Sequence, residues 1–100
     1  KGASDPFQAV SVNKTTVLNQ NYPNPFNPTT TIEFTLKQDG LVTLSIYNLL
    51  GQEVCKLLDG EMSAGTHKVQ FDAGRLSTGV YLYRLTTPDY TNSKKMMLVK

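Results

Sequence analysis

Few residues in the sequence could carry chemistry, and none has the neighbours that catalysis or metal binding requires. His67 is the only histidine and Cys55 the only cysteine, so the sequence supplies no second soft ligand for zinc and no evident activator for a thiol. Asp59 and Glu61 flank Gly60, but calcium takes roughly six to eight oxygen ligands. The sequence has no Gly-rich phosphate loop. It also has no nucleophile elbow that would activate Ser63, Ser77 or Ser93. We therefore predict no enzymatic activity, no metal and no cofactor.

Composition limits the class of protein further. The chain has 100 residues, of which 39% are hydrophobic and 18% charged, enough for one small core. A net charge of +2 is too weak for a nucleic-acid-binding footprint, and no run approaches the ~18 apolar residues of a membrane span. A single cysteine excludes an internal disulfide. The opening KGASDPF carries no signal peptide, and we expect it to continue a longer upstream chain.

Short alternating segments separated by turn residues predict an all-β fold, namely an Ig-like antiparallel β-sandwich of about seven strands. Strands are expected at residues 31–36, 41–48, 52–59, 66–72, 79–86 and 93–99, with an edge strand possible at the end of residues 1–17. A loop over residues 60–65 and a short turn of helix over residues 72–79, capped by Asp72, complete the connections.

Three of the expected strands supply most of the core. Their inward positions are Ile32, Phe34, Leu36, Val42, Leu44, Ile46, Tyr81, Tyr83 and Leu85. Residues 18–30 contain three of the five prolines and four asparagines, which disfavour both a helix and a central strand. We expect an extended segment there, anchored by Tyr22 and Phe26. Cys55 is expected to be a small buried hydrophobe, and His67 to lie on a strand face.

Five stretches of the sequence occur together in a distinctive order. They are Tyr22-Pro-Asn-Pro-Phe-Asn-Pro28 followed by Thr31, Ile32 and Phe34; Ile46-Tyr47-Asn48 with Leu50-Gly51; Ala64-Gly65 with His67; Leu76-Ser-Thr-Gly-Val-Tyr81; and Lys94-Lys-Met-Met-Leu-Val-Lys100. In this order they resemble the C-terminal sorting domains (type A) of the type IX secretion system. The resemblance spans residues 18–100, and its specificity comes from the combination of stretches.

This resemblance implies a β-sandwich that directs an upstream cargo through the periplasm and outer membrane to the cell surface or the medium. The implied partners are outer-membrane components of the type IX system, a sortase-like peptidase and an N-terminal cargo domain. We expect residues 1–17 to be a linker that contains the cleavage site, around residues 2–4 or 10–11, and residues 18–100 to form the sorting domain. The implied family-motif residues are Pro23, Asn24, Pro25, Phe26, Asn27, Pro28, Gly51, Gly79 and Tyr81.

The closing segment is the candidate recognition element. Its residues are Lys94, Lys95, Met96, Met97, Leu98, Val99 and Lys100. The stretch from Met96 to Val99 is apolar on both faces of a strand, and a terminal strand at a sheet edge could offer free main-chain groups for strand addition. We expect one face to pack on the core and the other to meet the secretion machinery. Deletion of Met96 to Lys100 is expected to leave the domain largely folded but to block export.

Several alternatives stay open. Residues 23–28 could dock in a groove that reads Pro-rich segments, or form a rigid lead-in to the first strand. Gly79 and Tyr81 could be recognised by the translocon. Alternatively, Gly79 could allow the chain to approach its neighbours closely where the strand begins, and Tyr81 could pack in the core. The chain could also be an Ig-like structural or carbohydrate-binding accessory module. A sugar site would need a flat exposed row drawn from Tyr47, Tyr81, Tyr83 and Tyr90.

Overall fold

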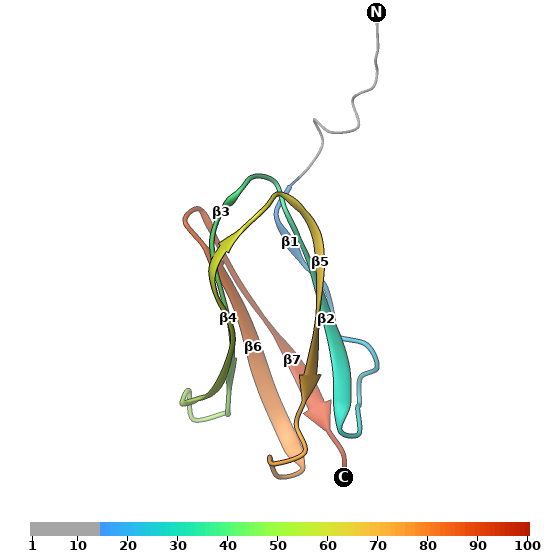
Figure 1. The fold of residues 1–100 in the computed structure, drawn as a ribbon. Coiled ribbons are helices and arrows are strands. Elements are labelled where there is room, and N and C mark those ends of the chain that lie inside the picture. Colours follow the sequence, from blue (N-terminus) through green and yellow to red (C-terminus); the bar gives the residue numbers. More distant parts are fainter. Residues whose placement is uncertain (1–14) are drawn as a thin grey trace, which may run out of the picture.

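The computed structural model describes residues 15–100, which fold into seven strands (Figure 1). The strands are β1 Val17–Leu18, β2 Thr29–Leu36, β3 Gly40–Tyr47, β4 Glu53–Met62, β5 Gly65–Asp72, β6 Gly79–Thr87 and β7 Tyr90–Leu98. The predicted all-β class is confirmed. Residues 15–100 contain no helix long and apolar enough to cross a membrane. The predicted boundary between residues 17 and 18 falls inside β1, and the predicted cleavage positions lie outside the described residues.

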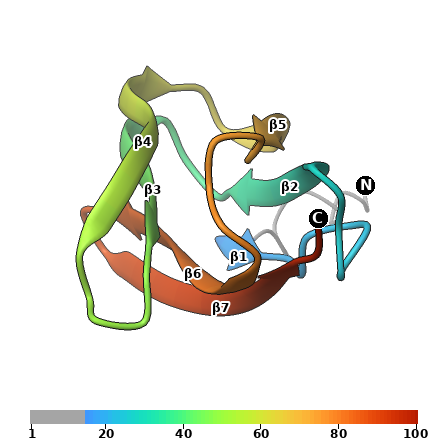
Figure 2. The same cartoon turned by 90° about the horizontal axis from the view of Figure 1, so that it is seen from below.

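Two antiparallel sheets face each other as the layers of a sandwich (Figure 2). One sheet has the strand order β1-β2-β5, and the other has the order β4-β3-β6-β7. β2 and β5 pair without interruption, from Thr29 opposite Asp72 to Leu36 opposite Gly65. β4 and β5 are therefore edge strands at one side of the sandwich, and β1 and β7 are edge strands at the other.

The core lies between the sheets and is built from alternate residues, because successive side chains of a strand point to opposite faces. The predicted core positions of β2, β3 and β6 are all buried: Ile32, Phe34, Leu36, Val42, Leu44, Ile46, Tyr81, Tyr83 and Leu85. The other buried apolar residues are Leu18, Phe26, Phe71, Ala73, Met96 and Leu98. The period-two pattern of the sequence thus identified the inner faces of the central strands correctly.

The Asn/Pro-rich segment closes the side of the sandwich between β1 and β7. The Tyr83 hydroxyl donates to the Asn19 carbonyl and accepts from the Asn21 N–H, both at 2.7 Å. The buried Asn21 side chain in turn donates to the Thr30 hydroxyl at 3.0 Å. The peptide bonds before Pro23, Pro25 and Pro28 are cis. In this segment the prolines interrupt strand pairing, and polar side chains form hydrogen bonds with the main-chain N–H and C=O groups instead.

Only one of the two predicted anchors in this segment is buried. Phe26 is 2% exposed, whereas Tyr22 is 80% exposed, so the prediction for Tyr22 was wrong. Tyr22 exchanges two main-chain hydrogen bonds of 2.9 Å with Thr31. This pairing holds the Tyr22 backbone beside β2, while the adjacent Asn21 takes the buried position. The hydrophobicity of tyrosine alone did not distinguish these two neighbours.

Two connections differ from their predicted form. β4 runs to Met62 and β5 begins at Gly65, so the predicted loop over residues 60–65 shortens to two residues. The predicted helical turn over residues 72–79 is absent. Instead, the Asp72 carboxylate accepts the Gly74 N–H at 2.9 Å, and the Ala73 carbonyl accepts the Leu76 N–H. Asp72 therefore stabilises a tight turn rather than capping a helix.

Candidate recognition surface

β7 presents two chemically different faces. Met96 and Leu98 point between the sheets and are 1% and 0% exposed. Met97 and Val99 point outward and are 44% and 43% exposed, and Lys95 is exposed on the same face. The burial of Met96 and Leu98 corrects the expectation that a chain truncated before Met96 stays folded, because the truncation would remove two core side chains.

The outer main-chain edge of β7 is already occupied near its end. The Phe26 N–H donates to the Met97 carbonyl, and the Phe26 carbonyl accepts the Val99 N–H, both at 2.9 Å. The Met97 N–H donates to the side-chain oxygen of Asn24 at 2.9 Å. β7 is an edge strand, but the expectation of free main-chain groups along Met97 to Val99 was wrong.

A further contact extends this cover toward the middle of the strand. The side-chain amide of Gln20 donates to the Lys95 carbonyl at 2.7 Å. Segments near the two ends of the domain therefore lie side by side. Side chains, rather than the main-chain edge, remain for contact at this end of β7.

The six residues from Pro23 to Pro28 are built into the fold. The Pro23 carbonyl accepts the Thr30 hydroxyl at 2.8 Å, and the Pro28 carbonyl accepts the Ala73 N–H at 2.9 Å. Phe26 packs its ring against Phe71, with centroids 6.3 Å apart. These contacts are those of a rigid lead-in to β2.

The basic residues of the closing segment have different surroundings. Lys94 lies opposite Tyr83 and is partly buried, whereas Lys95 is exposed beside Leu82. Lys100 is exposed, and its ammonium donates to the Gly74 carbonyl at 2.7 Å. Lys100 thus ties the end of the chain to the turn after β5.

A tight turn after β3 brings two leucines to the surface near this strand. Leu49 and Leu50 are 66% and 84% exposed. The Asn48 side chain holds the turn, since its carbonyl oxygen accepts the N–H groups of Leu50 and Gln52 at 2.9 and 3.0 Å. Gly51 adopts φ 84°, a left-handed conformation that favours glycine. This family-motif residue therefore has a conformational role in the turn.

We expect Gly51→Ala to destabilise the domain by ~1–2 kcal/mol, because an L-residue is strained in the left-handed region. The space itself is open, since nothing lies within 4 Å of an added Cβ. Gly60→Ala is the matched control, because Gly60 has equal space and no left-handed backbone. Urea denaturation measures both variants. Equal free energies of unfolding would contradict a conformational role for Gly51.

We use the name docking face for five residues from β6, from β7 and the residue after it, and from this turn: Leu49, Val80, Lys95, Met97 and Val99. Val80 lies directly opposite Met97 across the β6–β7 pair. A hollow of about 360 Å³ is lined by Leu49, Val80 and Met97 together with Asn24, Lys95 and Met96. No carboxylate lines this hollow. It can therefore accept an apolar side chain whose neighbours are acidic.

The sequence interpretation found only part of this surface. It named Lys95, Met97 and Val99 but missed Leu49 and Val80. Two consecutive leucines before a turn glycine were an available signal, because turn residues are usually exposed.

Sequence and structure comparisons place the chain among known proteins. The sequence profile described as "Secretion system C-terminal sorting domain" matches residues 20–100. The chain belongs to this family of type IX sorting domains. Among solved structures, dimeric latent PorU from Porphyromonas gingivalis matches with a TM-score of 0.66 and 22% identity. The match covers 86% of this chain and 10% of the PorU chain, so it supports the fold alone. No curated protein matches the sequence.

Tyr81 and Gly79 are two further family-motif residues of the sorting domain. Tyr81 is 8% exposed and its hydroxyl donates to the Ser77 carbonyl at 2.7 Å. At Gly79 the nearest heavy atom to an added Cβ is the Ser77 carbonyl oxygen at 4.0 Å, so the expected close approach is absent. Tyr81 contributes to the core, and Gly79 adopts φ 159°, a conformation that residues with a side chain rarely adopt, so the backbone rather than a close contact favours glycine at position 79.

The tyrosines of the sorting domain do not form an exposed row. Tyr81 and Tyr83 are buried, and Tyr90 is partly buried with its hydroxyl accepting the Leu18 N–H at 3.2 Å. Tyr47 is partly buried beneath the Arg84 guanidinium, which lies 4.9 Å from the ring centroid. The aromatic platform that a carbohydrate-binding alternative requires is therefore not formed by these four residues.

Burial of Tyr83 changes its acid–base behaviour. Desolvation raises the pKa of Tyr83 to about 12, although the hydrogen bond from Asn21 opposes this shift. The folded domain therefore keeps a proton that the unfolded chain has lost above its ordinary pKa of 10.0, so stability falls as pH rises from 10 toward 12. A shift of two pKa units corresponds to ~3 kcal/mol. Urea denaturation across this range should show a smaller loss for Tyr83→Phe than for the wild type, and equal slopes would contradict it.

Residues with potential chemistry are dispersed in the sorting domain. Within residues 15–100 no group of three His, Cys, Asp or Glu could hold a metal ion. The His67 Nε2–H donates to the Ser63 carbonyl at 2.7 Å, and the imidazole lies 5.4 Å from the Phe34 ring between centroids. Asp59 pairs with Lys56 at 3.6 Å, and Cys55 is partly rather than fully buried. These contacts give each residue a local structural role.

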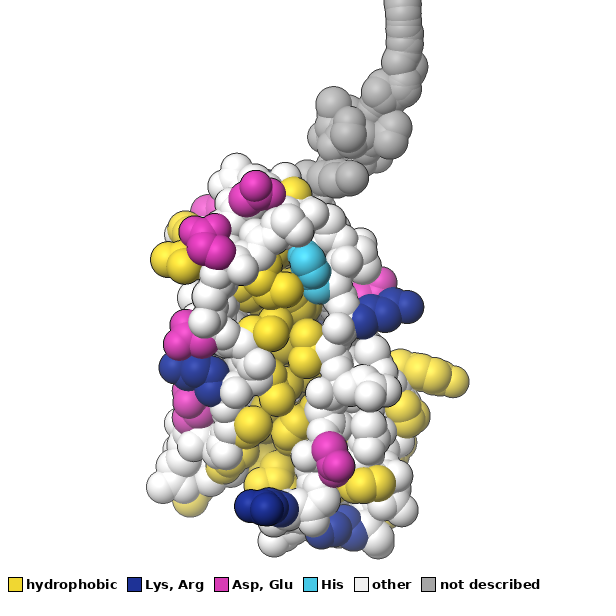
Figure 3. Space-filling model, viewed as in Figure 1, with side chains coloured by type: hydrophobic (Ala, Val, Ile, Leu, Met, Phe, Trp, Pro, Cys, Tyr) yellow, Lys and Arg dark blue, Asp and Glu magenta, His cyan; other side chains and the backbone are white. Residues whose placement is uncertain are grey.

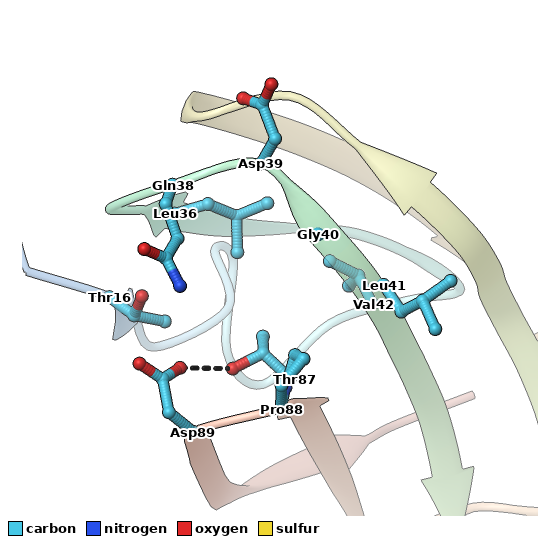
Figure 4. Close-up of a pocket in the computed structure, with 10 residues that line it drawn as sticks. All are labelled: Thr16, Leu36, Gln38, Asp39, Gly40, Leu41, Val42, Thr87, Pro88 and Asp89. Carbon is cyan, nitrogen blue, oxygen red and sulfur yellow. Dashed lines mark hydrogen bonds between the residues drawn. The ribbon is translucent and has the colours of Figure 1, made fainter.

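The hollow at the opposite end of the sandwich is small (Figure 4). Asp89 accepts the Thr87 hydroxyl at 3.2 Å and pairs with Lys37 at 3.0 Å. The hydrogen bond from Lys37 lowers the pKa of Asp89, and the Thr87 contact contributes. The accessible space is about 10 Å³, room for roughly one water molecule. This site fits no organic ligand.

Proposed function

We propose that this sorting domain directs an upstream cargo across the outer membrane by the type IX pathway, and that outer-membrane components recognise it as a folded unit. The family membership supports a secretion-signal role. The cargo would reach the cell surface or the medium by way of the periplasm. The domain's contribution is binding, with no chemical step of its own.

The docking face is the proposed point of recognition. Two of its exposed apolar side chains, Met97 and Leu49, line one hollow that has no acidic residue in its wall, and Val99 is a further exposed apolar residue close to Met97 in sequence. Because the outer edge of β7 is occupied by Asn24 and Phe26, the receptor would contact side chains rather than add a strand there. The observation that carries this proposal is the alternation of β7, which places Met97 and Val99 outside while Met96 and Leu98 hold the core.

The direct test fuses residues 1–100 to a periplasmic reporter in a bacterium with a type IX system. We expect the reporter to become accessible to protease on intact cells. The same fusion in a strain without the outer-membrane translocon is the control and should stay in the periplasm. Periplasmic retention of a folded fusion in the competent strain would refute the proposed role.

Removal by a sortase-like peptidase is the second part of the proposal. The cut would fall within residues 1–17, which precede or begin the first strand. Immunoblotting of the surface reporter should show the loss of most of the 11.1 kDa that residues 1–100 add to the fusion, and a peptidase-deficient strain should keep the fusion intact. An uncut fusion on the surface of competent cells would exclude cleavage while leaving the sorting role untouched.

A further inference from the structure

Charged residues are unevenly distributed over the outer face of the four-stranded sheet. Successive residues of a strand point to opposite faces, so about half of the residues of β6 and β7 point away from the core. These outward residues are Val80, Leu82, Arg84 and Thr86 on β6, and Thr91, Ser93, Lys95 and Met97 on β7. Neither strand contains a carboxylate. We call this part of the sheet, which is apolar and basic, the outer β6–β7 face.

The β4 part of the same sheet face carries both signs of charge. Glu53 lies opposite Tyr47 of β3, and Lys56 pairs with Asp59 at 3.6 Å. Figure 3 shows acidic and basic side chains together along β4. β3 lies between β4 and β6, so the carboxylates of β4 are separated by one strand from the outer β6–β7 face.

The two outward cations of the outer β6–β7 face have no acidic partner. Neither Arg84 nor Lys95 takes part in an ion pair within residues 15–100. Asp89, in the turn between the two strands, is paired with Lys37 at the far end of β7 from the docking face. On the other side of β7, residues 18–30 contain no charged residue. An anionic partner is therefore electrostatically favoured on this face.

Arg84 is held in an orientation that suits a carboxylate. Its Nε–H donates to the Ser93 hydroxyl oxygen at 3.1 Å, and its guanidinium carbon lies 4.9 Å from the centroid of the Tyr47 ring. The two terminal nitrogens have no such partner within the described residues. Because a guanidinium can donate two parallel hydrogen bonds to one carboxylate, this fixed and partly unused fork favours a carboxylate over a neutral ligand.

The hollow of the docking face and the two cations follow one another along the sheet. Val80, which lines the hollow, is followed on the outer face by Leu82 and then by Arg84, at steps of ~7 Å. Lys95 lies opposite Leu82, between the hollow and Arg84. An extended peptide presents every second side chain at the same spacing. Three alternate side chains of such a peptide can therefore meet the hollow, the ammonium and the guanidinium in turn.

We propose that the outer β6–β7 face binds an extended segment of an outer-membrane component in which one large apolar residue and two acidic residues occupy every second position. The apolar side chain enters the hollow beside Met97, one carboxylate pairs with Lys95, and the other forms a bidentate pair with Arg84. This inference rests on the proposed recognition through the docking face and adds the chemistry of the partner.

The first test titrates the full chain with a blocked synthetic peptide, Thr-Phe-Thr-Glu-Thr-Glu-Thr, followed by NMR. We expect shifts of the Arg84 Nε–H signal and of the Lys95 and Met97 amides, and weaker binding as salt is added, because exposed charges are screened. The matched peptide with glutamine in place of both glutamates should bind several-fold more weakly. Equal affinities of the two peptides would overturn the proposal.

Substitutions of exposed cations separate a bidentate pair from simple charge attraction. Arg84→Gln should weaken peptide binding several-fold, and Arg84→Lys should also weaken it, because lysine keeps the charge but lacks the planar fork. Lys56→Gln is the matched control, an exposed cation of the same sheet face on β4, and should bind as the wild type does. Wild-type affinity of a folded Arg84→Gln variant would overturn the proposal. Self-association that Arg84→Gln abolishes, without peptide binding, would assign the face to a second copy instead.

The export assay distinguishes this inference from the sorting role itself. In the reporter fusion, a folded Arg84→Glu variant is expected to stay in the periplasm while the wild type reaches the cell surface. Surface exposure of both fusions would exclude the acidic partner and leave the sorting role intact. Retention of both would refute the sorting role, and with it an outer-membrane component as the partner, whatever the peptide titration shows.

Discussion

Met97→Asp is expected to abolish export of the reporter fusion while leaving the domain folded. Met97 is 44% exposed, and its structural hydrogen bonds use main-chain atoms, so we expect a change in the free energy of unfolding of ~0.5 kcal/mol or less. In an apolar contact with a receptor, an unpaired carboxylate would cost ~3 kcal/mol or more, which is over a hundredfold in affinity. Protease accessibility of the reporter on intact cells measures export.

The matched control for this prediction is Thr91→Asp. Thr91 is exposed and lies on the same face of the same strand, opposite Thr86, but it is remote in sequence from the docking face. We expect Thr91→Asp to export normally and Met97→Leu to retain export. Normal export of a folded Met97→Asp variant would show that the export machinery does not recognise the docking face.

Tyr83→Ala is expected to have the largest effect on stability. The Tyr83 side chain is fully buried and its hydroxyl bonds to Asn19 and Asn21. Loss of a large buried aromatic ring costs ~3–5 kcal/mol, and a main-chain group left unpaired adds ~1–3 kcal/mol. Since small domains have ~5–15 kcal/mol in total, much of this variant should be unfolded. Urea denaturation and NMR spectra provide the measurement.

Two other substitutions separate the contribution of the Tyr83 hydroxyl from that of the ring and provide an exposed tyrosine as a control. Tyr83→Phe keeps the ring and removes the hydroxyl, so it should cost only the hydrogen-bond part, ~1–3 kcal/mol. Tyr22→Ala changes a side chain that is 80% exposed and should stay within ~0.5 kcal/mol of the wild type. The importance of the buried hydroxyl would be contradicted if Tyr83→Phe were as stable as the wild type.

The central strands could be predicted from the sequence because their two faces differ in polarity. Ile32, Phe34 and Leu36 alternate with polar residues, and only one register buries all three. β4 was harder to place because its sequence, EVCKLLDGEM, mixes apolar and charged residues without strict alternation. Its pairing with β3 is irregular after Leu44 and after Ile46, and such irregularities cannot be located from hydrophobicity alone.

The candidate site was predicted only along the strand itself. The alternation of Met96 and Met97 follows from strand geometry. The occupation of the β7 edge does not follow from strand geometry, because it depends on contacts with Asn24 and Phe26, which are distant in sequence. Asn and Pro indicate turns and local hydrogen bonds, but they do not identify a partner strand.

The hydrogen bond between Asn24 and Met97 joins residues 73 positions apart. Such non-local contacts form late and make folding slow. A chain that ends before Met96 would lack Met96 and Leu98 in its core. Its Asn/Pro-rich segment would also lack the main-chain groups of Met97 and Val99 as hydrogen-bond partners. This domain is therefore complete only once β7 has been synthesised.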